Sequence, residues 1–189
     1  MSIFGRSKQH QRGVGLIEVM VSLLLLAVAV LGYVALQSTA LSATDESITK
    51  TNIITLVRDV ADRIRYNPSV MDEYQAELKD FGDKFEASGA TAAPTPDCQS
   101  AACTAMQQAA ADSYIAAQKA YASGYRLAMV VCPAAATGIM QTRCLIGSWG
   151  STTPTLGADS DPNDGTMDCI DDSDGNYHRG SECLILEVQ

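Results

Sequence analysis

Residues 19–36 read VMVSLLLLAVAVLGYVAL, and this stretch decides the fold. It belongs to a longer run, residues 19–44, that contains no Asp, Glu, Lys or Arg. A helix that crosses a bilayer needs about 20 apolar residues, so the run predicts one transmembrane helix. Three cations, Arg6, Lys8 and Arg12, precede it, and Glu18 is the first acidic residue. The positive-inside rule therefore places residues 1–13 in the cytoplasm and the remainder of the chain outside.

The overall composition restricts the function. The chain has 189 residues, with 13 Lys and Arg against 22 Asp and Glu, and a formal net charge of −9. Affinity for nucleic acid comes largely from Lys and Arg, so no nucleic-acid partner is expected. The sequence has no G-x-S-x-G motif and no phosphate-binding loop, and His178 has no catalytic companion in the pattern. We therefore predict that the protein is not an enzyme and needs no cofactor.

Glu18 stands at the cytoplasmic edge of the apolar run, with no cation between it and the span. A carboxylate at that depth is costly unless it is paired or functional. Two simpler interpretations remain open. One is a solvated glutamate at the membrane edge, and the other is an ordinary signal peptide cut after small residues such as Ala27, Ala29 or Ala35.

Residues 11–24, QRGVGLIEVMVSLL, resemble the class III signal of type IV pilins and type II secretion pseudopilins. In that family a prepilin peptidase cuts after a glycine on the cytoplasmic face, and the fifth residue of the mature chain is glutamate. The resemblance implies cleavage between Gly13 and Val14, because Glu18 then becomes the fifth residue. Cleavage after Gly15 would make it the third. Val14 occupies a position where the family usually has Phe or Met, and the family methylates the new amine.

The resemblance also implies a role for Glu18, which the family pairs with the α-amine of a neighbouring subunit to register it during assembly. An ammonium and a carboxylate that lipid would each penalise neutralise one another when helices pack side by side. Residues 56–68, LVRDVADRIRYNP, further resemble the PilV-type minor pilins, or pilus modification proteins. This subgroup implies a minor pilin, placed at the tip of a type IV pilus, that helps to prime assembly.

The implied partners are the prepilin peptidase, the inner membrane, other minor pilins and the major pilin. The prepilin would sit in the inner membrane with its head in the periplasm and would then enter the pilus at the cell surface. Two alternatives remain open: a minor pseudopilin of a type II secretion system, and a signal-anchored periplasmic binding protein that never enters a filament.

The apolar pattern predicts an α+β, pilin-like fold, in which a long N-terminal helix packs on a small antiparallel sheet. Apolar residues at 53, 56/57, 60 and 64 continue the helix to about residue 65, and Asn67-Pro68 ends it. A second helix is predicted between Cys103 and Tyr121, with its apolar face at Met106, Ala109, Ala110, Tyr114, Ala117 and Tyr121.

Residues 72–97 are predicted to be loop or weak helix, and strands are predicted at 125–132, 143–149 and 183–188. The domain plan is a leader over 1–13, a transmembrane and filament-core helix over 14–44, and a periplasmic head over 45–189. The head includes the amphipathic half of the long helix.

Six cysteines occur, all of them after the apolar run. Sequential pairing would close short local loops, and an oxidising periplasm favours disulfides, although the sequence leaves other connectivities open. A zinc site is the rival interpretation, but no C-x-x-C spacing supports it. The candidates are Cys98, Cys103, Cys132, Cys144, Cys169 and Cys183.

Seven aspartates crowd residues 159–174. Asp159, Asp161 and Asn163 begin like a calcium-binding loop, but Gly165 falls at the seventh place instead of the sixth and Ile170 takes the twelfth. A solvated acidic loop is the favoured interpretation and no metal is predicted. A calcium site of another type is the alternative.

Overall fold

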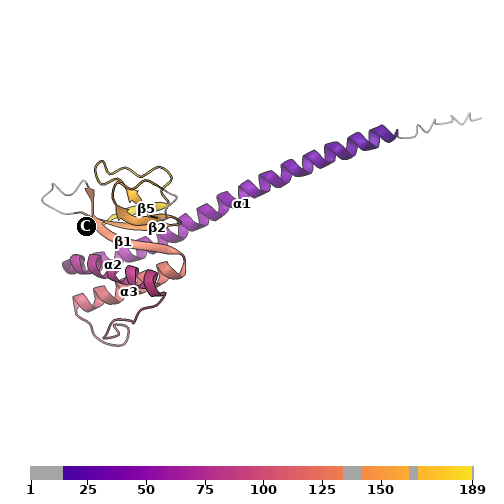
Figure 1. The fold of residues 1–189 in the computed structure, drawn as a ribbon. Coiled ribbons are helices and arrows are strands. Elements are labelled where there is room, and N and C mark those ends of the chain that lie inside the picture. The colour runs from indigo at the N-terminus through magenta and orange to yellow at the C-terminus, as the bar shows by residue number, and fades with distance from the viewer. Residues whose placement is uncertain (1–14, 134–141, 162–165, 189) are drawn as a thin grey trace, which may run out of the picture. The chain divides into compact units, whose positions relative to one another are not determined.

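The computed structural model describes residues 15–133, 142–161 and 166–188 (Figure 1). It contains helices α1 (Leu16–Tyr66), α2 (Met71–Ser88) and α3 (Ala105–Ala122), with a short 3₁₀ turn, Pro68–Val70, between the first two. The strands are β1 (Tyr125–Val131), β2 (Arg143–Trp149), β3 (Thr152–Leu156), β4 (Met167–Ile170) and β5 (Cys183–Val188). The predicted α+β class, with a long N-terminal helix and a small antiparallel sheet, is confirmed.

The chain divides into two compact units, residues 1–48 and 49–189. In the first, the described residues form one continuous helix, the N-terminal part of α1. In the second, the rest of α1 packs on the sheet through Ile53, Val57, Val60 and Ile64, which are all buried. Their spacing is the predicted one, because residues three or four apart share one face of a helix.

Helix α1 ends where the sequence predicts. Asn67 leaves the helical region, with φ −137° and ψ 56°, directly before Pro68. The proline ring disfavours the helical conformation in the residue that precedes it. The Asn67 side chain then donates a hydrogen bond from Nδ2 to the carbonyl oxygen of Ala105, 2.8 Å away, which joins this end of α1 to the start of α3.

Of the two alternatives predicted for residues 72–97, loop or weak helix, the first two thirds are helical and form α2, a regular helix of about five turns. Tyr74, Leu78, Phe81 and Phe85 recur every three or four residues and are buried. The many charges between them, which suggested a loop, occupy the opposite face. The helix ends at Gly89, whose left-handed φ of 71° suits a residue without a Cβ.

The predicted second helix is present as α3, and its buried face agrees with the prediction in part, since Ala109 and Ala117 are buried. Met106 and Tyr121 are largely exposed, whereas Ala116 and Ala120 are buried. Alanines leave room for a neighbouring helix to pack closely, and α2 lies against this face. The start of α3 carries a capping box, in which the Thr104 side chain accepts from the Gln107 backbone and the Gln107 side chain accepts from the Thr104 backbone.

The predicted strands form a three-stranded antiparallel sheet in the order β1-β2-β5. Leu127, Met129, Leu145 and Val188 face the helices and share their core. Side chains alternate along each strand, so Val130, Ile146 and Ile185 point to the opposite face. That face is covered by β3 and β4, a parallel pair that the sequence analysis did not anticipate.

The acidic segment is therefore not simply a loop. Residues Met167–Ile170 form β4, and Cys169 and Ile170 are buried against Ile146 of the sheet. A four-residue segment with three apolar residues, Met167, Cys169 and Ile170, was too short to reveal a strand among so many aspartates. Leu156 of β3 is also packed against this cluster.

Candidate functional site: the N-terminal motif, the apolar helix and the head

The predicted processing junction, Gly13 and Val14, lies outside the described residues. Glu18 lies in the first turn of α1 and is exposed. Its backbone N–H donates to the carbonyl oxygen of Gly15 (2.9 Å), and its own carbonyl accepts from Ser22 Oγ (2.7 Å). Among the described residues, no cation lies within ion-pair distance of the Glu18 carboxylate. This carboxylate is therefore available to a group from outside the described chain.

Helix α1 contains a stretch that is long and apolar enough to cross a membrane, and none of that stretch is buried. Leu16, Ile17, Leu24 and Leu31 are between 64% and 77% exposed. So much exposed apolar surface requires lipid or other apolar helices as its surroundings.

Four hydroxyl groups of this part of the helix are satisfied internally. Ser22, Thr39, Ser42 and Thr44 each donate to the carbonyl oxygen four residues earlier, at 2.7 to 3.1 Å. Such internal bonds remove the cost of placing a free hydroxyl in an apolar medium. The surface thus suits lateral packing between helices inside a bilayer or a filament.

In the head, a partly buried ion pair joins α1 to α3, and a hydrogen bond extends it to α2. Asp112 of α3 accepts a hydrogen bond from Arg63 Nη1 of α1 (2.7 Å) and another from the Tyr74 hydroxyl of α2 (2.9 Å). Gln108 donates a third bond to the same carboxylate. Burial and the Asp112 carboxylate raise the pKa of Tyr74 well above its ordinary value. The hydrogen bond to Asp112 also raises the pKa of Arg63. This cluster fixes the helices to one another, and sequence reasoning missed it because its members come from distant segments.

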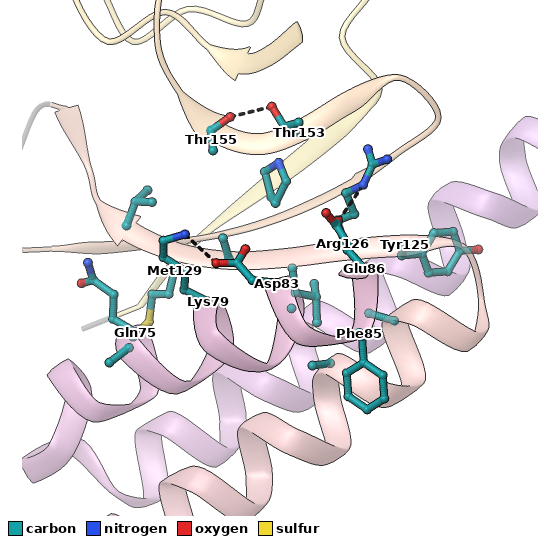
Figure 2. Close-up of a pocket in the computed structure, with 18 of the residues that line it drawn as sticks. Gln75, Lys79, Asp83, Phe85, Glu86, Tyr125, Arg126, Met129, Thr153 and Thr155 are labelled. Carbon is teal, nitrogen blue, oxygen red and sulfur yellow. Dashed lines mark hydrogen bonds and ion pairs between the residues drawn. The ribbon is translucent and has the colours of Figure 1, made fainter. Parts of the chain in front are cut away.

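A groove of about 600 Å³ lies between α2, β1 and β3. Figure 2 shows its charged side chains in pairs: Lys79 contacts Asp83 on α2, and Glu86 of α2 contacts Arg126 of β1, both at 2.8 Å. Much of the remaining lining is apolar, including Met129. Since these charges neutralise one another, the groove offers no evident set of catalytic or ion-binding groups within the described residues.

The acidic segment shows no metal site in its described part. Asp159 accepts hydrogen bonds from the Asp161 backbone N–H and from the Thr166 hydroxyl, each at 3.1 Å, and Asn163 lies outside the described residues. The described residues contain no group of three or more His, Cys, Asp or Glu side chains that could hold a metal ion. The Nε2 atom of His178 lies 2.9 Å from the carbonyl oxygen of Gly157.

The six cysteines form three disulfides in sequential order. The first closes the loop between α2 and α3, the second joins the end of β1 to β2, and the third joins β4 to β5. No described cysteine is free. The pairs are Cys98–Cys103, Cys132–Cys144 and Cys169–Cys183.

The exposed apolar half of α1 and the α+β head define a class of proteins that combine a long apolar N-terminal helix with a small α+β head. Comparison with known families gives the particular assignment. The prokaryotic N-terminal methylation motif matches residues 8–34, and the family described as type IV pilin Tt1218 matches residues 35–114. The two matches together span residues 8–114, and over this stretch the chain is similar to type IV pilins. No curated protein and no solved structure matches it.

This similarity gives the general function. Pilins are structural subunits, and a prepilin motif implies processing by a prepilin peptidase followed by assembly into a pilus. The motif and the apolar helix fit a protein that is first anchored in a membrane and then enters a pilus.

Proposed function

We propose that this protein is a minor pilin, inserted in the inner membrane with its head in the periplasm, cut after Gly13 and incorporated at the tip of a type IV pilus. There it helps to prime assembly together with other minor pilins. The observation that carries this proposal is the coincidence of the prepilin motif with a helix whose apolar half is wholly exposed. An exposed apolar surface of this extent suits repeated contacts between helices better than a role as a simple membrane anchor.

The charge of the head favours a minor role over that of the bulk subunit. Residues 49–189 hold ten Lys and Arg against 19 Asp and Glu. Heads of like charge repel one another at the close spacing of a filament, so a pilus built from this chain alone is disfavoured. Less acidic neighbours, such as other minor pilins or the major pilin, are the expected partners.

Glu18 has a defined task in this proposal. After cleavage, the new α-amine would lie one helical turn before the carboxylate, within the same chain and within each neighbour. A carboxylate with no cation beside it among the described residues can accept the amine of an adjacent subunit. This pair would set the axial position of an incoming helix.

N-terminal sequencing of the chain from sheared pili, with its copy number, tests the proposal. We expect a mature protein that begins at Val14 and is far scarcer than the major subunit. Gly13→Arg should leave the protein uncut and retained in the membrane, whereas Gly15→Ala, outside the junction, should be processed. A mature chain that begins elsewhere, or one as abundant as the major subunit, would contradict the proposal.

The two alternatives give different results in the same experiment. A minor pseudopilin would be cut at Gly13 but would depend on secretion genes and stay out of sheared pili. A signal-anchored binding protein would keep residues 1–13. The resemblance of residues 56–68 to PilV-type minor pilins favours the pilus over both.

A further inference from the structure

The two edges of the β1-β2-β5 sheet carry different sets of free backbone groups. At the β5 edge, the N–H of Trp149 donates to the carbonyl oxygen of Glu182 (2.9 Å), and these residues continue the β2–β5 register. Hydrogen-bonding direction alternates along a strand. The even-numbered residues of β5 therefore bond to β2, and the outward-facing backbone groups are those of Cys183, Ile185 and Glu187.

The edge of β1 is covered. By the same alternation, the N–H of Cys132 donates to Thr142, so the odd-numbered residues of β1, including Leu127, face outward. Helix α2 lies against them, because a Cβ placed on Gly82 would be only 3.7 Å from the Leu127 carbonyl oxygen. An ion pair from Glu86 to Arg126 also joins the helix to this edge strand. Beside Leu127 the space along this edge is limited to the groove between α2, β1 and β3.

The edge of β5 lacks these protections. In the described part of the chain, no strand pairs with its outer side. Its sequence, CLILEV, contains no proline and no lysine, the residues that commonly protect exposed edges. Leu184, Ile185 and Leu186 are only half-buried, and Glu187 is exposed. The strand therefore offers a row of unpaired donors and acceptors beside incompletely covered apolar side chains.

We propose that the outer edge of β5 binds an extended strand from the head of another pilin subunit, an inference that rests on the proposed function. Main-chain hydrogen bonds to Ile185 and Glu187 would supply the pairing, as in other cases of strand addition. The incoming strand would be apolar opposite Ile185 and would carry Lys or Arg opposite Glu187, because opposite charges across paired strands stabilise the sheet. A small pilin head would thereby gain a continuous sheet with its neighbour.

A second copy of this chain is the less favourable occupant. The head carries nearly twice as many acidic as basic residues, and Glu182 and Glu187 lie at the two ends of the edge. Bringing two such edges together would place acidic side chains near one another without added cations. A less acidic head with a basic residue on its own edge strand satisfies both the hydrogen bonds and the charge.

The sharpest test replaces the outward N–H at an exposed position. Glu187→Pro removes a donor that β2 does not use, and proline is tolerated on edge strands where the N–H faces away from the sheet. Glu187→Ala removes the same side chain but keeps the N–H, so it is the matched control. The full-length variants would be purified in detergent and tested against every other pilin-family protein of the same genome, each purified singly.

We expect the wild-type chain to bind one of these pilins, and Glu187→Pro to bind it at least about tenfold more weakly than Glu187→Ala. Equal binding by the two variants would overturn the proposal, as would the absence of binding to any pilin. If the wild-type chain forms a dimer and Glu187→Pro dissociates it, the occupant of the edge is a second copy of this chain. This result would overturn the proposed choice of partner.

Amide hydrogen exchange provides a readout that does not depend on a variant's folding. In the isolated full-length chain, the N–H groups of Ile185 and Glu187 should exchange much faster than that of Leu186, and partner binding should protect them selectively. Unchanged exchange at both positions in the complex would overturn strand addition. If the chain is nevertheless found in sheared pili, the minor-pilin assignment stands by itself, so the two failures are distinguishable.

Discussion

Replacing Gly147 with alanine should destabilise the head, because α1 crosses the sheet at this glycine. A Cβ at Gly147 would lie 2.9 Å from Ile53 Cγ1 and 2.9 Å from Val57 Cγ2. Carbon atoms pack best at about 3.5–4.0 Å, so both side chains would have to move by roughly half an ångström or more. Ile53 and Val57 are at most 1% exposed and branched at Cβ, so neither can move into open space or rotate freely.

The magnitude follows from two opposing contributions. Overpacking a well-packed core costs about 1–3 kcal/mol. Replacing glycine also reduces the conformational entropy of the unfolded chain, which stabilises the folded state by about 0.4–1 kcal/mol. The free energy of unfolding should therefore fall by about 1–2 kcal/mol, and Tm by roughly 3–8 °C for a head of this size.

Denaturant unfolding of the oxidised full-length chain in detergent measures this change. The protein has one tryptophan, Trp149, which is half-buried against the same core, so its fluorescence reports on the contact directly. Gly82→Ala is the matched control: a Cβ there meets its nearest atom at an ordinary 3.7 Å, and alanine is favoured within α2. Gly82→Ala should raise stability by up to about 1 kcal/mol.

A double mutant isolates the cause. Ile53→Ala alone should cost about 2–5 kcal/mol, since it leaves a cavity in the core. The double mutant with Gly147→Ala should lose less stability than the sum of the two single-mutant losses, because the new methyl group occupies part of that cavity. Unchanged or increased stability in Gly147→Ala, with Gly82→Ala behaving as expected, would refute the close approach of α1 to β2.

Three further predictions concern assembly, pH and the disulfides. Glu18→Ala should be inserted and cut but recovered poorly in sheared pili, and wild-type recovery would exclude the registering role. Because folding raises the pKa of Tyr74, the stability linked to its neutral hydroxyl is complete at neutral pH and declines as the pH rises past the ordinary tyrosine pKa of about 10. Tyr74→Phe should flatten this alkaline decline in unfolding measurements, and an unaltered slope would contradict the assignment. Cys183→Ser should cost about 3 kcal/mol by opening a loop to Cys169 and should expose the acidic segment to protease; resistance equal to wild type would contradict this.

Much of the long helix could be predicted from the sequence. Each apolar residue of the run contributes its own free energy of transfer into a membrane, whatever the rest of the fold. The ring of Pro68 disfavours the helical conformation at Asn67 and so ends the helix. The family assignment rests on residues around Gly13 and Glu18, which are neighbours in sequence. The three strands of the main sheet were also predictable, since each is a short apolar run bounded by turn residues.

Helix α2 shows where local pattern failed. Its charges dominate the composition, while its fold is set by four apolar residues whose burial needs α3 and β1 as partners. The predicted apolar face of α3 included Met106 and Tyr121, which are exposed, and omitted Ala116 and Ala120, which are buried because the space between packed helices favours small side chains. Propensity and periodicity cannot show which face will find a partner.

The sequence by itself determined that this chain has a prepilin-type N-terminus, one long apolar helix and a small cysteine-rich α+β head, because these features depend on composition and on residues close together in the chain. The tertiary structure alone decided the β3–β4 pair, the Asp112 cluster, the approach of α1 at Gly147 and the contrast between the covered β1 edge and the open β5 edge. Each depends on contacts between segments far apart in sequence, and the free energy of such contacts exists only once the chain has folded.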